Sequence, residues 1–144
     1  MLSYEDAGGA ADWLSRAFGF RERLRYTEPD GRVSHAELEL NDGVVMLATP
    51  TRDYQGPKQH REACEAARTW SEVPYVIDGV MVWVDDVDAH FEHATAAGAT
   101  ILSEPADQAG GIRHYRAEDP EGHRWMFSQV IREVAPEEWG AVER

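Results

Sequence analysis

The 144-residue sequence contains a single cysteine. One thiol, Cys64, excludes an internal disulfide and any zinc site built from cysteines. The acidic neighbours Glu62 and Glu65 disfavour the thiolate that a cysteine nucleophile needs. We therefore expect an inert thiol in this position.

Basic residues are also scarce. Lysine and arginine number 14, against 27 aspartate and glutamate residues, and the formal net charge is −13. No basic cluster exists that could replace the counterions of a phosphate backbone, so the composition argues against nucleic-acid binding. Acidity of this kind is typical of a solvated surface, and it would also suit a cationic ligand.

Long hydrophobic runs are missing as well. No window approaches the roughly 20 apolar residues that a membrane helix needs. The segment from Met1 to Asp12 has neither the basic nor the apolar region of a secretory signal. We therefore expect a cytoplasmic protein that does not contact a membrane.

The most informative stretch that is present runs from Asp119 to Ser128. Pro120 pre-sets φ and Gly122 takes the positive φ of a tight turn, after which apolar and mixed residues alternate as in a strand. By this alternation Trp125 and Phe127 face the helices, and the residues between them face the other side of the sheet. These are Arg124, Met126 and Ser128.

The first half of the chain predicts one helix followed by three antiparallel strands. Apolar residues recur at helical spacing up to Gly19, which suits a glycine that ends a helix. Turn residues separate the three strands that follow. The predicted bounds are 6–20 for the helix and 21–26, 33–40 and 44–49 for the strands.

The second half repeats this order, with a strand over 79–84, a helix over 86–98, strands over 99–102 and 109–118, and a last strand after Asp119. Eight residues separate His35 from Gly43, and eight separate His114 from Gly122. Equal spacing indicates an internal duplication. The duplication pairs His35 with His114, Glu37 with Arg116, and Leu47 with Met126, or Met46 with Met126 if the register shifts by one.

These patterns predict an α+β fold of two tandem βαβββ modules, whose curled mixed sheets surround a cavity. We expect a single domain over 1–130, with module one at 1–50, a connecting loop at 51–74 and module two at 75–130. A tail with a short helix follows at 131–144. Because only five residues precede Asp6, the first strand is expected to be clipped, or residues to be missing before Met1.

Three motifs resemble the glyoxalase, bleomycin-resistance and extradiol dioxygenase superfamily, which has the vicinal oxygen chelate fold. The resemblance covers roughly residues 1–130, and it implies a divalent metal held by His and Glu from the first and last strand of each module. The motifs are Ala17-Phe18-Gly19-Phe20, Val84-Asp85-Asp86-Val87-Asp88-Ala89-His90 and Asp119-Pro120-x-Gly122-His123-x-Trp125.

The ligand positions carried over from that family do not suit a metal. They fall on Gly79 and Met126 in module two and on Leu47 or Met46 in module one, while the remaining histidine would precede Met1. None of these side chains offers a hard ligand. The sequence is therefore similar to the metal-free members, which sequester a small molecule and are commonly homodimers, some with modules exchanged between chains.

The leading interpretation is a small-molecule-binding protein with no metal and no cofactor, whose organic ligand is cationic or aromatic. The residues expected to contact it are Leu47, Met81, Trp83, Arg116, Arg124 and Met126. Two simpler roles stay open: Trp83 as a core residue, and Glu37 paired with Arg116. The alternative function is a glyoxalase-like lyase or isomerase, with a non-standard metal site or metal-independent acid/base chemistry at His35, Glu37 or His114.

Overall fold

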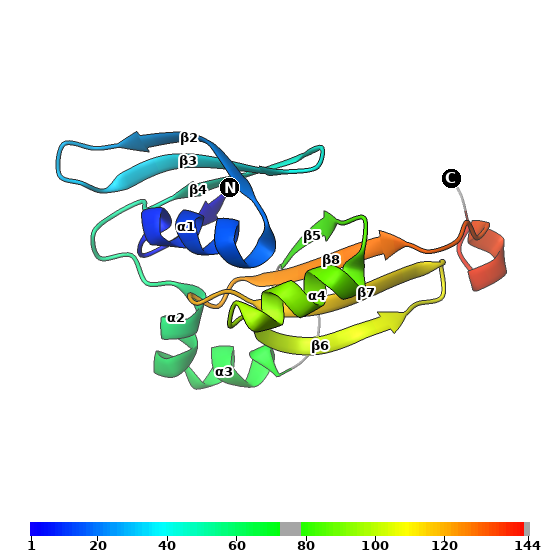
Figure 1. Ribbon diagram of the computed structural model, residues 1–144. Coiled ribbons are helices and arrows are strands. Elements are labelled where there is room, and N and C mark those ends of the chain that lie inside the picture. The colour runs from blue at the N-terminus through cyan, green and yellow to red at the C-terminus, as the bar shows by residue number, and fades with distance from the viewer. Residues whose placement is uncertain (73–78, 143–144) are drawn as a thin grey trace.

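Each half of the chain forms a four-stranded mixed sheet (Figure 1). The computed structural model describes residues 1–72 and 79–142. Sheet A has the order β1-β4-β3-β2, with β1 parallel to β4 and the other pairs antiparallel. Its elements are β1 (Leu2–Ser3), α1 (Ala7–Phe18), β2 (Arg21–Thr27), β3 (Val33–Leu40) and β4 (Gly43–Ala48).

Sheet B repeats this topology with the order β5-β8-β7-β6, and β5 is parallel to β8. The predicted α+β fold of two tandem βαβββ modules is therefore confirmed. Its elements are β5 (Gly79–Trp83), α4 (Val87–Ala96), β6 (Thr100–Asp107), β7 (Ile112–Glu118) and β8 (Arg124–Val130).

Two short helices, α2 (Pro57–Ala63) and α3 (Glu65–Ser71), lie between the modules, and a 3₁₀ helix, η1 (Pro136–Trp139), follows β8. The expected boundary between connecting loop and module two, at residues 74 and 75, lies outside the described residues. Within the described ranges, no helix is long and apolar enough to cross a membrane.

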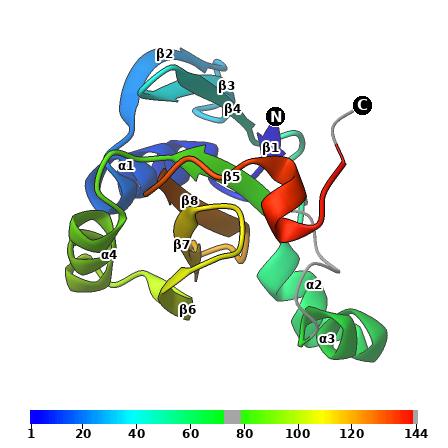
Figure 2. The same ribbon diagram turned by 90° about the vertical axis from the view of Figure 1, so that its right-hand side faces the viewer.

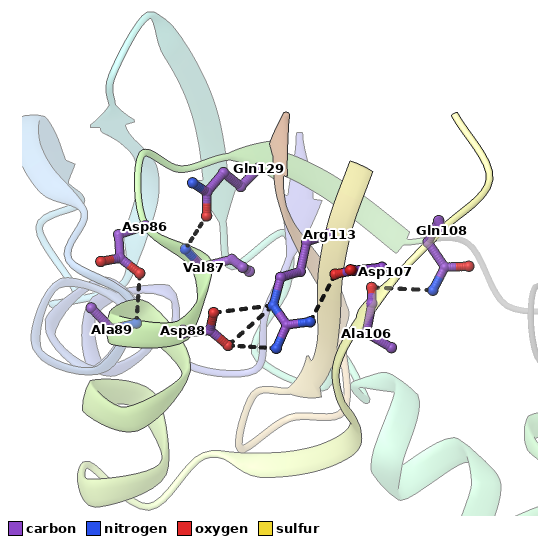
Figure 3. A network of polar contacts seen from close by, with 9 residues as sticks. All are labelled: Asp86, Val87, Asp88, Ala89, Ala106, Asp107, Gln108, Arg113 and Gln129. Atoms are coloured by element: carbon purple, nitrogen blue, oxygen red, sulfur yellow. Dashed lines mark hydrogen bonds and ion pairs between the residues drawn. The ribbon is translucent and has the colours of Figure 1, made fainter. Parts of the chain in front are cut away.

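Polar contacts at the first turn of α4 attach this helix to sheet B (Figure 3). The side chain of Asp86 accepts a hydrogen bond from the backbone nitrogen of Ala89, as an N-terminal cap does. The side-chain oxygen of Gln129 on β8 accepts one from the backbone nitrogen of Val87. Arg113 on β7 pairs with Asp88 at 2.9 Å. The sequence predicted a helix that begins at residue 86, whereas the two contacts with β7 and β8 depend on the packing.

Both modules share one hydrophobic core, built from the helix-covered faces of the two sheets. The ring centroid of Phe18, at the end of α1, lies 4.7 Å from that of Phe127 in an edge-to-face contact and 5.7 Å from that of Trp125 in a tilted one. α1 thus packs on sheet A and reaches sheet B beside α4 (Figure 2). As the strand alternation predicts, Trp125 and Phe127 are fully buried on this side.

The other face of each sheet points away from this core, and we call it the open face. The two sheets match the expected tandem modules, but neither is closed, so each presents an open face instead of surrounding a cavity. On sheet B the open face carries Gly79, Met81 and Trp83 from β5, Arg124, Met126 and Ser128 from β8, and His114, Arg116 and Glu118 from β7. On sheet A it carries Val44 and Met46 from β4, His35, Glu37 and Glu39 from β3, and residues of β2.

The register corrects one pairing of the duplication. Met46 lies opposite Glu37, just as Met126 lies opposite Arg116. Leu47 is instead the counterpart of Phe127 and is fully buried in the core. The shift arises because the hairpin in module one closes through two residues, Asn41 and Asp42, while the turn in module two is longer.

Strand β6 differs most from the prediction, since it continues to Asp107 rather than ending at Leu102. The strand contains a proline at position 105. β6 is an edge strand, however, and proline is tolerated there because an outward-facing N–H is not needed. Its irregular register against β7 between Ile101 and Ala106 accommodates the ring.

Candidate ligand-binding site

A cavity of about 380 Å³ lies on the open face of sheet B. Met81 and Met126 form its floor at neighbouring positions of β5 and β8. Leu102 and Ser103 of β6 line one side, and the end of α3 approaches at Ser71. A mostly apolar hollow of this size with a few polar groups is what sites for small organic molecules generally look like.

Arg116 and Arg124 add positive charge to the cavity wall. Arg116 lies beside Met126 in the register of β7 and β8, and Arg124 lies beside Glu118. Burial lowers the pKa of His114, and the charge of Arg116, two residues along the same strand, lowers it further. The arginines therefore place guanidinium groups on this face of a strongly acidic protein.

Glu118 forms ion pairs with two arginines beside the cavity. Its carboxylate lies 2.8 Å from Arg61 of α2 and 3.8 Å from Arg124 of β8. The three side chains are 12–17% exposed. A terminal nitrogen of Arg124 also donates to the backbone oxygen of Ser71 at 2.5 Å. α2 and α3 are thereby attached near the open face, on the side of sheet B away from α4 (Figure 2).

Trp83 lies on the same open face but outside this cavity. It borders a second hollow, of about 350 Å³, between β5 and the turn that joins β3 to β4. Asn41 in that turn donates its side-chain amide to the backbone oxygen of Trp83 at 2.8 Å. Trp83 is 44% exposed. The simpler interpretation of Trp83 as a core residue is therefore wrong.

The candidate catalytic residues are divided between the sheets. His35 and Glu37 are neighbours on the open face of sheet A, with Nε2 of the histidine 3.1 Å from a carboxylate oxygen. Glu37 also lies 3.4 Å from Arg23. His114 lies on the open face of sheet B, which is a different surface. The structure thus brings together two of the three candidates.

The residues at the family's metal positions do not fit a divalent ion. Gly79 has no side chain, and Met126 and Met46 present thioethers where hard ligands are required. Across residues 1–72 and 79–142, no group of three or more His, Cys, Asp or Glu side chains could hold a metal. The donor set gives no basis for a metal-dependent step at these positions.

Of the six residues expected to contact a ligand, four line the cavity on sheet B: Met81, Arg116, Arg124 and Met126. Trp83 borders the neighbouring hollow, and Leu47 is in the core. Sequence reasoning missed Leu102, the last residue of the expected strand, and Ser103, which lies beyond that expected end. It also missed Arg61 and Glu118, whose contact joins segments 57 positions apart in the chain.

The chain resembles known proteins along nearly its whole length. The family described as the Glyoxalase/Bleomycin resistance protein/Dioxygenase superfamily matches residues 1–127. An uncharacterized protein of Mycobacterium bovis, Mb0911c, is 36% identical over 141 residues, which are 95% of this chain and 85% of that protein. The uncharacterized protein Rv0887c of Mycobacterium tuberculosis is likewise 36% identical, over 95% of this chain and 76% of its own.

Solved structures give the same result. TioX from Micromonospora sp. ML1 is 37% identical with a TM-score of 0.66, and the match covers 90% of this chain and 94% of that one. A glyoxalase/bleomycin resistance protein/dioxygenase family enzyme from Burkholderia phytofirmans PsJN is 19% identical with a TM-score of 0.58, covering 90% and 94%. At that identity the second likeness supports the fold alone.

Proposed function

The chain belongs to the glyoxalase/bleomycin resistance protein/dioxygenase superfamily, and from this premise we propose that it binds and sequesters a small organic molecule without a metal. The cavity on the open face of sheet B carries the proposal. It combines an apolar floor with charged groups at its wall, and Met126 stands in it where the metalloenzymes of the family have a glutamate. The lone cysteine suits a reducing compartment, and we propose the cytoplasm as the location.

A second copy of the chain completes the site in this proposal. Both open faces point away from the core and leave large apolar side chains partly exposed, including Leu24 and Val44 on sheet A and Met81 on sheet B. Their central residues have opposite charge, because Glu37 on sheet A occupies the position of Arg116 on sheet B. A homodimer that brings sheet A of one copy over sheet B of the other buries both faces and encloses the ligand.

The test uses 2-naphthamide, a neutral aromatic probe, with saturation-transfer NMR on the full chain. With about 13 non-hydrogen atoms at roughly 0.3 kcal/mol each, its dissociation constant should be on the order of 1 mM. Met126→Trp fills the cavity and should abolish the transfer. Ile131→Trp, a half-exposed position just beyond β8, is the control. Undiminished saturation transfer from Met126→Trp to the probe, or no transfer from the wild type, would reject the cavity as the binding site.

One observation favours the alternative of glyoxalase-like lyase or isomerase activity. His35 and Glu37 are in contact on the open face of sheet A, and a carboxylate beside an imidazole is a common arrangement for a general base. This alternative predicts turnover of the hemithioacetal of methylglyoxal and glutathione, which His35→Ala should abolish. The absence of turnover, with and without added divalent metals, would leave binding alone.

A further inference from the structure

We propose that the hollow between β5 and the turn joining β3 to β4 binds a short extended peptide, which adds a strand beside β5. This inference goes beyond the proposed function, because the hollow lies next to the cavity over Met126 and is a separate site. The two sites meet at Val80 and Met81, which line both.

One wall of the hollow is the outer edge of β5, which pairs with β8 on its other side and is the last strand of sheet B. In a parallel ladder, both backbone groups of alternate residues point to the same neighbouring strand. The backbone nitrogen of Val84 donates to β8, so Val82 also points that way. The N–H and C=O of Met81 and Trp83 therefore point outward, to the side of the hollow.

A side chain from module one already binds to this edge. The amide of Asn41 donates to the backbone oxygen of Trp83 at 2.8 Å, which is the hydrogen bond that the N–H of an added strand would make. Among residues 1–72 and 79–142, the N–H of Trp83 and both backbone groups of Met81 have no hydrogen-bond partner. Extended peptides bind to strand edges through groups of this kind.

The opposite wall includes a second strand edge, on β4. β1 pairs only with Leu47 and Ala48 of β4, whereas β5 pairs with Arg124–Ser128 of β8. The backbone oxygen of Ala48 accepts from β1, so the alternate residue Val44 points its backbone groups to the same side. In the described part of the chain, no strand lies beside Val44 on that side, and Val44 lines the hollow. Hydrogen-bonding groups therefore face the hollow from both sheets.

These two edges define the occupant. At a rise of about 3.3 Å per residue, the part of β5 that lines the hollow, Val80–Trp83, matches a peptide of roughly three or four residues. Its side chains alternate between the two faces, so a central apolar side chain can contact Phe20 and Val82 in the hollow. The contact of Asn41 with Trp83 closes one end, which favours a short peptide over a long strand of a larger partner.

The first test titrates acetyl-Thr-Val-Thr-amide into the isotope-labelled full chain and follows backbone amide signals by NMR. The amide proton of Met81 should move downfield and exchange more slowly with solvent, because it gains an acceptor. Methylating the nitrogen of the central valine removes one donor from the peptide and should weaken binding about three- to tenfold. Equal affinity of the methylated peptide, or no change at Met81 at saturation, would overturn the inference.

Two variants separate this site from the cavity. Val44→Trp, at a half-exposed position, fills the hollow and should abolish peptide binding while 2-naphthamide binding persists. Met126→Trp should do the reverse, because 2-naphthamide has a single amide and cannot bond to both edges. Circular dichroism confirms that each variant is folded.

Peptide binding that survives Val44→Trp, or that is lost in Met126→Trp, would overturn the inference. Dissociation of a wild-type dimer by the peptide would also overturn it, since a second copy would then occupy the hollow. Failure of the wild type to bind 2-naphthamide would reject the proposed function and leave this inference standing.

Discussion

Ser128 lies on the open face of sheet B, yet it is fully buried and its hydroxyl has no partner in the described part of the chain. Its counterpart in sheet A is Ala48, because Ser3 pairs with Ala48 as Trp83 pairs with Ser128. A buried hydroxyl without a partner costs free energy that alanine avoids. We expect Ser128→Ala to leave the free energy of unfolding unchanged or raise it by up to about 1 kcal/mol, as measured by urea denaturation.

Thr49 supplies the contrast for that measurement. It is also buried, but its hydroxyl accepts from the backbone nitrogen of Ala7 at 2.8 Å and donates to the backbone oxygen of Glu5 at 3.3 Å. Thr49→Val keeps the shape and leaves both backbone groups unsatisfied, so it should lower the free energy of unfolding by about 1–3 kcal/mol. If Ser128→Ala were as damaging as Thr49→Val, the hydroxyl of Ser128 would have a partner after all.

Metal binding is the second test at the scale of single residues. With Gly79, Met46 and Met126 at the family's ligand positions, chelator-treated protein should show the same melting temperature with and without Zn²⁺, Ni²⁺, Mn²⁺ or Fe²⁺, because a ligand stabilises only if it binds the native state. A rise in melting temperature that disappears in His35→Ala or His114→Ala would place a non-standard metal site at those histidines.

At the scale of elements, two histidines of α4 join it to the end of α1. Nε2 of His90 donates to the backbone oxygen of Phe18 at 2.9 Å, and Nδ1 accepts from the hydroxyl of Tyr115 at 2.7 Å. Nε2 of His93 donates to the backbone oxygen of Arg16 at 2.8 Å. Acceptance at Nδ1 of His90 requires the neutral imidazole of that residue, and the donations from His90 and His93 connect the helices of the two modules.

The hydrogen bonds of His90 should make the stability of the protein depend on pH. Burial, and to a lesser extent the charge of His93, lower the pKa of His90 below its usual 6.5. The unfolded chain then binds a proton more readily than the folded one, so the contribution to stability is complete above pH 6.5 and is lost as the pH falls toward the folded-state pKa. Urea denaturation at about pH 7.5 and 5.5 should show a smaller loss of stability for His90→Gln than for the wild type.

The pKa of His114 is also lowered. Because this shift is present in the wild type and in His90→Gln alike, the difference between the pH dependences of these two proteins reports on His90. His60→Gln, a substitution on the exposed surface of α2, is the control and should keep the wild-type dependence. Equal pH dependence in His90→Gln and the wild type would mean that the contact between α4 and α1 forms equally well when His90 is protonated.

The elements show what sequence alone could predict. Strand periodicity placed Met81, Arg124 and Met126 on one face, and the turn at Asp119 appeared with Gly122 at φ 89°. Periodicity cannot detect a one-residue difference between two turns, which is why Leu47 was paired with Met126. Nor does it reveal contacts such as that of Glu121, whose carboxylate accepts hydrogen bonds from the backbone nitrogens of residues 5 and 6. Such contacts depend on packing between distant segments.

At the scale of the whole molecule, two open faces remain on a chain whose helices already share one core. The half-exposed apolar side chains on them would be costly to leave in water. The proposed homodimer removes both faces from solvent at once, with an equivalent interface at each of two sites, as two-fold symmetry requires. Repulsion between two copies of charge −13 opposes association. Added salt screens this repulsion, so the dimer dissociation constant should fall as the salt concentration rises.

Sedimentation equilibrium should therefore give a mass of about twice 16.2 kDa. Leu24→Arg places a charge on the open face of sheet A, where the partner's arginines approach. An unpaired buried charge costs roughly 2–5 kcal/mol, which raises the dimer dissociation constant by about 30-fold or more. Val142→Arg adds the same charge to an exposed tail position and should leave the dimer intact. If Leu24→Arg dimerised as tightly as the wild type, sheet A would not lie in the interface; a wild type that stayed monomeric would leave each cavity open on one side and confine ligand binding to sheet B alone.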